Sequence, residues 1–151
     1  MDNDEAHRTY GEKSSFHHNL YVYNLNRQPK IVTQTGPFDF RNNVIEDWRS
    51  QGTEIEEANS VNIINNYYGS SAQGDDNLDG FCIDANSVNI YTAGNYNVYE
   101  DVDSQGDRGT PVEEPSVTTM AAGTALVNDV RGDCGAMPRD SFDEGYAGPA
   151  N

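Results

Sequence analysis

The sequence predicts a mainly β protein with extended arms, little regular core and one short helix near residues 44–51. Hydrophobic residues make up only 35% of the 151 positions, below the roughly 45–50% of ordinary globular domains, so we expect little private core. Apolar and polar residues alternate along Phe16–Asn24, which predicts a strand. The hexamer Ala-Asn-Ser-Val-Asn-Ile occurs twice, at Ala58–Ile63 and Ala85–Ile90, and predicts two β-rich pseudo-repeats.

The N-terminal part divides into a polar arm over residues 1–13 and a segment of β structure plus a short helix over residues 14–57. Within this segment, a turn at 26–29 leads into a second short strand, Lys30–Thr33. The Gly-Pro pair that follows ends the strand.

A capping pattern predicts the helix. Asn43 is a candidate N-cap, and Glu46, three residues later, completes a capping box. Val44, Ile45 and Trp48 then form one apolar face. A helix of about two turns is unstable by itself, so this face predicts docking onto another surface.

The two hexamers open pseudo-repeats over residues 58–84 and 85–106. Each repeat reads as a β segment, an Asn/Tyr segment and an acidic turn. We expect the hexamers to occupy equivalent positions, stacked as rungs or paired as hairpins, with their asparagines over one another. Two copies are too few for a self-supporting solenoid, which needs about three repeats.

The C-terminal part begins with a linker over residues 107–116. Residues 117–151 follow as a strand-like segment and an acidic irregular tail. The Thr and Val content of Val117–Val127 favours a strand there. The tail from Asn128 onward is rich in Gly and acids, so we expect no regular structure in it.

The charge is strongly acidic and unevenly distributed. The net charge is −16, and residues 51–151 carry three arginines against eighteen acids. Such a surface disfavours nucleic acid and anionic membranes as partners. The N-terminus carries no apolar run, so we expect no signal peptide or membrane span, and synthesis in the cytoplasm.

No strong metal or cofactor site is expected. Asp75, Asn77 and Asp79 match the opening of a calcium loop, but the twelfth position holds Asn86 instead of a bidentate Glu. They remain a weak candidate. His17 and His18 are adjacent, and on a strand they would point to opposite faces and could not share a metal.

The chain shows no nucleophile elbow, phosphate-binding loop or dinucleotide turn, so we expect no catalytic residues, no cofactor and no enzyme activity. The abundant tyrosines favour a protein interface over base stacking, given the charge. They include Tyr67, Tyr68, Tyr91, Tyr96 and Tyr99.

The stretch from Asn59 to Gly74 resembles a segment of the small internal capsid protein of picornaviruses. In that family an Ile-Ile-Asn-Asn-Tyr-Tyr-like run lines the inner shell. The likeness covers about a tenth of the chain. The chain departs from the family in lacking a Gly after Met1 and an apolar C-terminal run, so membrane penetration is not implied. A looser similarity links it to clamp or cement proteins of reovirus-like double-stranded-RNA viruses.

These observations favour a structural interaction protein of a virion that clamps or cements neighbouring capsid subunits, or copies of itself, and is ordered mainly by those contacts. Alternatives are a self-assembling β fibril or signalling amyloid, and a calcium-dependent extracellular binding module. The expected partner-binding residues are apolar side chains on the predicted strands and helix: Phe16, Leu20, Val22, Phe38, Phe40, Val44, Ile45, Trp48, Val61, Ile63, Val88 and Ile90.

Overall fold

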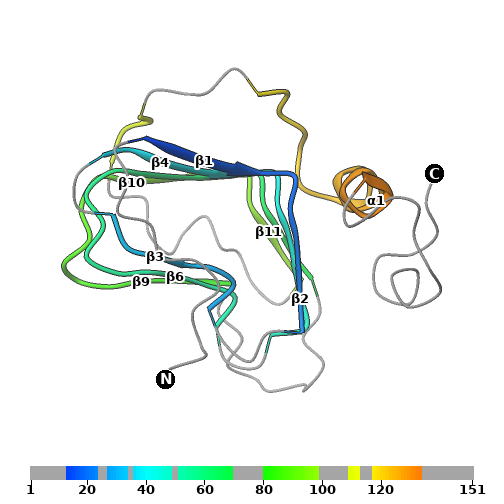
Figure 1. The fold of residues 1–151 in the computed structure, drawn as a ribbon, viewed down its shortest axis with the longest axis horizontal. Helices are drawn as coiled ribbons and strands as arrows, with labels where there is room; N and C mark the ends of the chain where they lie inside the picture. The colour runs from blue at the N-terminus through cyan, green and yellow to red at the C-terminus, as the bar shows by residue number, and fades with distance from the viewer. Residues whose placement is uncertain are drawn as a thin grey trace.

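In the computed structural model, the described residues are 13–23, 27–33, 36–48, 51–69, 80–98, 109–112 and 117–133. Their strands wind around a common axis as a parallel β-helix with three sheets (Figure 1). Each of the first three coils places one strand in each sheet, the fourth adds described strands to two of them, and successive coils stack in parallel register. The mainly β expectation and the presence of one short helix are therefore confirmed.

Sheets A and B each contain four strands, and sheet C contains three. The strands of sheet A, in spatial order, are β1 (Ser14–His17), β4 (Phe38–Arg41), β7 (Val61–Ile64) and β10 (Ile90–Ala93). Those of sheet B are β2 (Leu20–Val22), β5 (Val44–Glu46), β8 (Tyr67–Tyr68) and β11 (Tyr96–Asn97). Those of sheet C are β3 (Lys30–Ile31), β6 (Thr53–Ile55) and β9 (Phe81–Ile83).

A ladder of four asparagines, Asn19, Asn43, Asn66 and Asn95, marks the corner between sheets A and B. Successive members lie 24, 23 and 29 residues apart. Each Oδ1 in the second, third and fourth coils accepts a hydrogen bond from the backbone N–H of the previous ladder asparagine, at 2.9–3.1 Å. The same oxygen accepts a second bond from that residue's side-chain amide, at 3.0–3.1 Å.

The ladder amides also bond to the backbone of the preceding coil. Asn43 Nδ2 donates to the Phe16 carbonyl, and Asn66 Nδ2 donates to that of Phe40, each at 3.0 Å. The residue before each ladder asparagine has a φ of 50–65°, which turns the chain from sheet A into sheet B. Asn and Gly, which tolerate this left-handed conformation, occupy that position in coils two to four.

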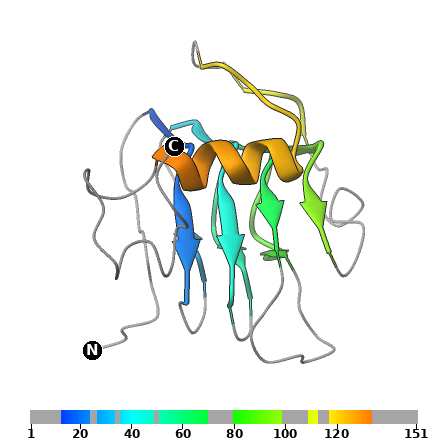
Figure 2. The same ribbon diagram turned by 90° about the vertical axis from the view of Figure 1, so that its right-hand side faces the viewer.

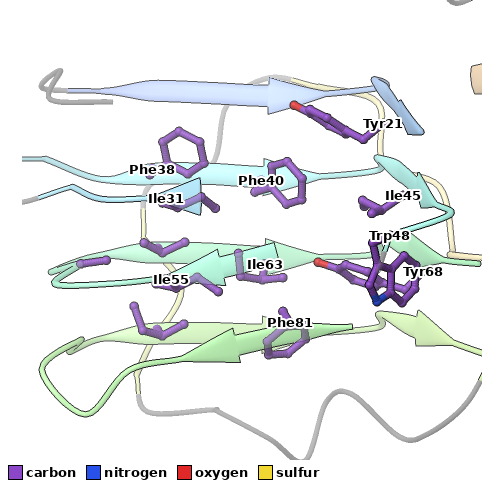
Figure 3. Close-up of a cluster of buried hydrophobic side chains, with 13 residues drawn as sticks. Tyr21, Ile31, Phe38, Phe40, Ile45, Trp48, Ile55, Ile63, Tyr68 and Phe81 are labelled. Atoms are coloured by element: carbon purple, nitrogen blue, oxygen red, sulfur yellow. The ribbon is translucent and has the colours of Figure 1, made fainter. Parts of the chain in front are cut away.

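The interior is filled by stacked apolar side chains from all three sheets (Figure 3). In sheet A, Phe38, Val61 and Ile90 form one inward column through consecutive coils. Trp48 lies between β5 and β6 of coil two, fully buried and edge-on to Tyr68, with ring centroids 6.1 Å apart. The core is therefore larger than the low hydrophobic content predicted, because each coil adds inward side chains to the same columns.

Helix α1 (Thr124–Asp133) packs against the outer face of sheet B (Figure 1). It runs across the strands, along the axis of the coils (Figure 2). Ten residues of helix span about 15 Å, close to the roughly 14 Å between the outer strands of a four-stranded sheet. One short helix is therefore long enough to reach across the sheet, and its buried side chains pack on Leu20, Val44 and Tyr67 of coils one to three.

Three expectations about local structure are wrong. Residues 44–46 form strand β5 instead of a helix, because Asn43 caps no helix but bonds Asn19 from the neighbouring coil. The segment Val117–Val127 is not a strand, and its last residues belong to α1. The same helix gives regular structure to the start of the tail, because Leu126 and Val130, four residues apart, are buried on one face.

The repeated hexamers do not occupy equivalent positions. Sheet A pairs Val61 with Ile90, so the hexamers are offset by two residues. Val61 is fully buried whereas its sequence equivalent Val88 is 53% exposed. Asn89 has a φ of 50°, unlike Asn62, which lies within β7. The repeat boundaries predicted from the hexamers therefore do not coincide with the coils.

We predict that Asn66→Ala lowers the free energy of unfolding by about 2–4 kcal/mol. The substitution leaves the Asn43 N–H and the Phe40 carbonyl without their partner, and each unsatisfied buried group costs about 1–3 kcal/mol. Denaturant unfolding of the purified chain measures the effect. Asn86→Ala, at an exposed position, is the control and should change stability by less than about 0.5 kcal/mol. Equal effects of the two substitutions would contradict the ladder's role.

Candidate interaction surface

The outer face of sheet B carries apolar and aromatic side chains, of which Tyr96 is 46% exposed. One outward column runs through the four coils as Leu20, Val44, Tyr67 and Tyr96. Helix α1 covers part of it: Leu126 and Val130 bury against Val44, with Leu20 and Tyr67 packed around them. An ion pair between Arg131 of α1 and Glu46 of β5 closes the contact beside this column.

Coil four is the part of this face that remains exposed. Tyr96 is 46% exposed and Val98 is 40% exposed. The Tyr67 ring stacks on that of Tyr96, with centroids 5.3 Å apart and planes 15° from parallel. Burial, Glu46 and Tyr96 together raise the pKa of Tyr67, so its hydroxyl remains protonated at neutral pH. We call Tyr67, Tyr96 and Val98 the tyrosine patch.

Gly69 lies against the side chains of Glu46 and Tyr67, at the edge of the tyrosine patch. A Cβ built at Gly69 would lie 2.8 Å from Glu46 Cγ and 3.1 Å from Tyr67 Cε1. A larger residue would displace the Tyr67 ring or the Glu46 side chain, which is paired with Arg131. The glycine therefore holds the tyrosine stack and the α1 ion pair in their present positions.

The outer face of sheet A is covered by the strap, which we define as residues 109–112 and 117–123. Asn62 accepts a hydrogen bond from the Val112 N–H at 3.1 Å and donates to the Val112 carbonyl at 3.4 Å. Asn42 makes the same pair of bonds to the backbone of Met120. Two side-chain amides thus bind the backbone of the strap and hold it against the middle of this sheet.

A buried ion pair lies beneath the strap. Arg41 binds both carboxylate oxygens of Asp39, and both side chains are almost fully buried. Ser15 and Asn62 donate to the same carboxylate at 3.2 and 3.0 Å, and Arg41 also donates to Thr119 of the strap. This network satisfies the charges within the fold, which makes it a structural feature and not an open site.

Sheet C presents charged side chains on its outer face. Arg27 Nε lies 2.9 Å from Glu54 Oε2, and Lys30 Nζ lies 3.4 Å from the same oxygen. Lys30 also pairs with Glu56. Burial alone would lower the pKa of Lys30, but the two glutamates outweigh it and raise that pKa. The basic groups of this face are therefore neutralised by neighbouring acids.

His17 and His18 lie at the first corner of the coil. The expectation that they point to opposite faces is wrong, because His18 leaves the strand with a φ of 54°. Their Nδ1 atoms lie 3.1 Å apart and their rings are nearly perpendicular. Burial and the neighbouring His17 lower the pKa of His18, and Asp129 of α1 raises it in part.

The structure places most of the expected partner-binding residues inside the coil. Phe38, Phe40, Ile45, Trp48, Val61, Ile63 and Ile90 are buried in the central core, and Val44 is buried beneath α1. Phe16, Leu20 and Val22 are partly buried, and Val88 is exposed. Of the tyrosines, Tyr68 is enclosed and donates to Thr53, while Tyr96 faces outward.

Several expected features fall outside the described residues. Asp75, Asn77 and Asp79 of the weak calcium candidate do so, as does Tyr99. Within the ranges that the structure describes, no three His, Cys, Asp or Glu side chains group together as metal ligands. No helix there has the length and apolar character needed to cross a membrane.

Comparisons with known proteins identify no relative of the chain. No protein-family model, curated protein sequence or solved structure matches the chain.

We predict that His18→Asn makes stability less sensitive to acid. The folded-state pKa of His18 lies below its unfolded value of about 6.5, so the unfolded chain binds the proton more readily. Protonation therefore favours unfolding as the pH falls below about 7, and the wild-type chain should lose stability that the variant keeps. Denaturant unfolding at pH 7.5 and 5.5 measures the difference. Parallel losses in the two proteins would contradict the lowered pKa.

Proposed function

We propose that the chain is a structural interaction protein that binds a neighbouring subunit of a larger assembly through its tyrosine patch. The observation that carries this proposal is the stacked Tyr67–Tyr96 pair, in which Tyr96 is exposed beside Val98 while α1 packs on the first three coils of the same sheet. Tyrosine is enriched at protein interfaces because it offers a large contact area with few rotatable bonds.

The scaffold beneath the patch favours binding. Tyr67 and Tyr96 are held on paired strands whose register is fixed by the bonds between Asn66 and Asn95. A partner would therefore meet side chains already in place and would avoid much of the entropy cost of ordering them. The patch is small, so its contribution depends on a few anchoring contacts and not on total area.

Charge indicates the kind of partner. The chain carries a net charge of −16, and α1 exposes Asp129 and Asp133 on the same side of the molecule. A basic protein surface would be attracted and oriented by this charge, whereas nucleic acid would be repelled. A viral capsid is the assembly that the local sequence resemblance favours, with the chain as a clamp or cement protein.

The extent of the core argues against the expectation that the chain is ordered mainly by its partner. The apolar columns that were expected to bind a partner instead pack on one another within a single chain. We therefore propose that the coil folds by itself and presents the tyrosine patch to its partner, in place of being ordered by it.

The proposal predicts that a photoreactive phenylalanine analogue at position 96 crosslinks mainly to one other protein in the organism that encodes the chain. Tyr23 is the matched control, because it is also a tyrosine, is 58% exposed and lies on the first coil. Mass spectrometry of the crosslinked products identifies the partner. The same product at both positions, or no dominant product at position 96, would contradict the proposal.

Once the partner is identified, Tyr96→Ala should weaken its binding by about thirtyfold, since an interface hot spot contributes about 2 kcal/mol or more. Tyr23→Ala should leave the affinity within about twofold, because a contact outside the interface contributes nothing to it. Crosslinks from position 96 to a second copy of the chain would instead favour the self-assembling alternative.

A further inference from the structure

The corner between sheets A and B differs in the first coil. The residue before the ladder asparagine is Asn42, Asn65 or Gly94 in coils two to four and His18 in coil one. In an extended strand His18 would project away from His17. Its left-handed φ reverses the side-chain direction, so both imidazoles lie on the same side of the corner.

The two ring nitrogens are close enough to share one proton in a hydrogen bond, or to bind one metal ion together. His17 Nδ1 and His18 Nδ1 lie 3.1 Å apart, with ring planes 84° from parallel. Either a single proton or a metal ion can occupy such a gap. Two nitrogens bound to one ion at about 2.0–2.1 Å lie about 2.8–3.4 Å apart for bond angles between square and tetrahedral. The 3.1 Å between the two Nδ1 atoms falls within this range.

The surroundings favour a cation. Asp129 of α1 is close enough to His18 to act on it electrostatically. The chain as a whole is strongly acidic, which raises the local concentration of divalent ions. The Asn19 side chain donates to the His17 carbonyl at 3.1 Å, which ties the loop of the corner to the ladder. The histidine pair is thus carried on a rigid corner, as a preorganised metal site requires.

We propose that His17 Nδ1 and His18 Nδ1 form a two-histidine binding site for a divalent transition-metal ion such as Zn²⁺. Imidazole is a preferred ligand for Zn²⁺, Ni²⁺ and Cu²⁺, whereas Ca²⁺ and Mg²⁺ prefer oxygen ligands. The protein supplies two ligands and water completes the coordination, so the ion is exchangeable. Burial favours the neutral imidazole of His18, the form that binds metal.

The experiment uses the full chain without a histidine tag and Zn²⁺ alone in a non-chelating buffer at pH 7.5. Calorimetry should show one saturable site, and NMR should show shifts of the His17 and His18 ring protons at the same Zn²⁺ concentrations. Zn²⁺ is preferred to Cu²⁺ as the probe because a free N-terminal amine also binds copper strongly.

His18→Asn is the decisive variant, because asparagine already occupies this corner in coils two and three. The variant should therefore fold normally. We expect it to weaken Zn²⁺ binding by at least about tenfold, since even mutation of an outer-shell partner costs 10–100-fold. His17→Gln should act similarly. His7→Ala is the control for the third histidine and should leave binding unchanged.

Two results would overturn the proposal. The first is an absence of saturable Zn²⁺ binding by the wild-type chain, which would mean that the pair shares a proton only. The second is binding that His18→Asn leaves unchanged, which would assign the ion to the acidic side chains. Unfolding curves recorded for each variant show whether the fold is intact before binding is compared.

Discussion

The hydrogen bond between one ladder asparagine and the next is the interaction on which the rest of the structure depends. The Oδ1 atoms of Asn43, Asn66 and Asn95 each accept the backbone N–H and the side-chain amide of the asparagine one coil earlier. The corner would otherwise bury these groups without partners, because the chain leaves one sheet before it enters the next. The ladder also fixes the register, since a slip of one residue would turn every inward side chain outward.

The fixed register determines which faces of the coil are available. On sheet A it aligns the polar side chains that hold the strap, and on sheet B it aligns the apolar column on which α1 packs. Both coverings come from residues after the last coil, so the C-terminal part closes surfaces that the coils leave open. The exposed end of sheet B and the histidine corner are the features that remain for binding.

The sequence predicted the class of structure but not the coil, and particular residues show why. The β character followed from alternating apolar residues such as those of β2. Asn43 was recognised as a residue that accepts a backbone N–H, but its donor lies 24 residues away and not three. The signal for the ladder is an asparagine preceded by a residue that tolerates a left-handed φ. Its unequal spacing of 24, 23 and 29 residues conceals the period.

The repeated hexamers were misleading because sequence identity did not determine their conformation. Sheet A begins five residues before each ladder asparagine, at positions 14, 38, 61 and 90. Val88 lies too far from Asn95 to fill this position, so Ile90 takes it. The abundance of tyrosine in the sequence was a usable signal for the tyrosine patch. The meeting of His17 and His18 depended on a backbone angle that no sequence pattern predicted.

The most direct test of the coil is the register between its third and fourth turns. In a methyl-labelled sample, nuclear Overhauser effects report which Val and Ile side chains lie close together. The structure predicts strong contacts from Val61 to Ile90 and none from Val61 to the exposed Val88. Contacts of Val61 with Val88 and of Ile63 with Ile90 would show that the hexamers stack on each other, and would contradict the ladder-defined coil.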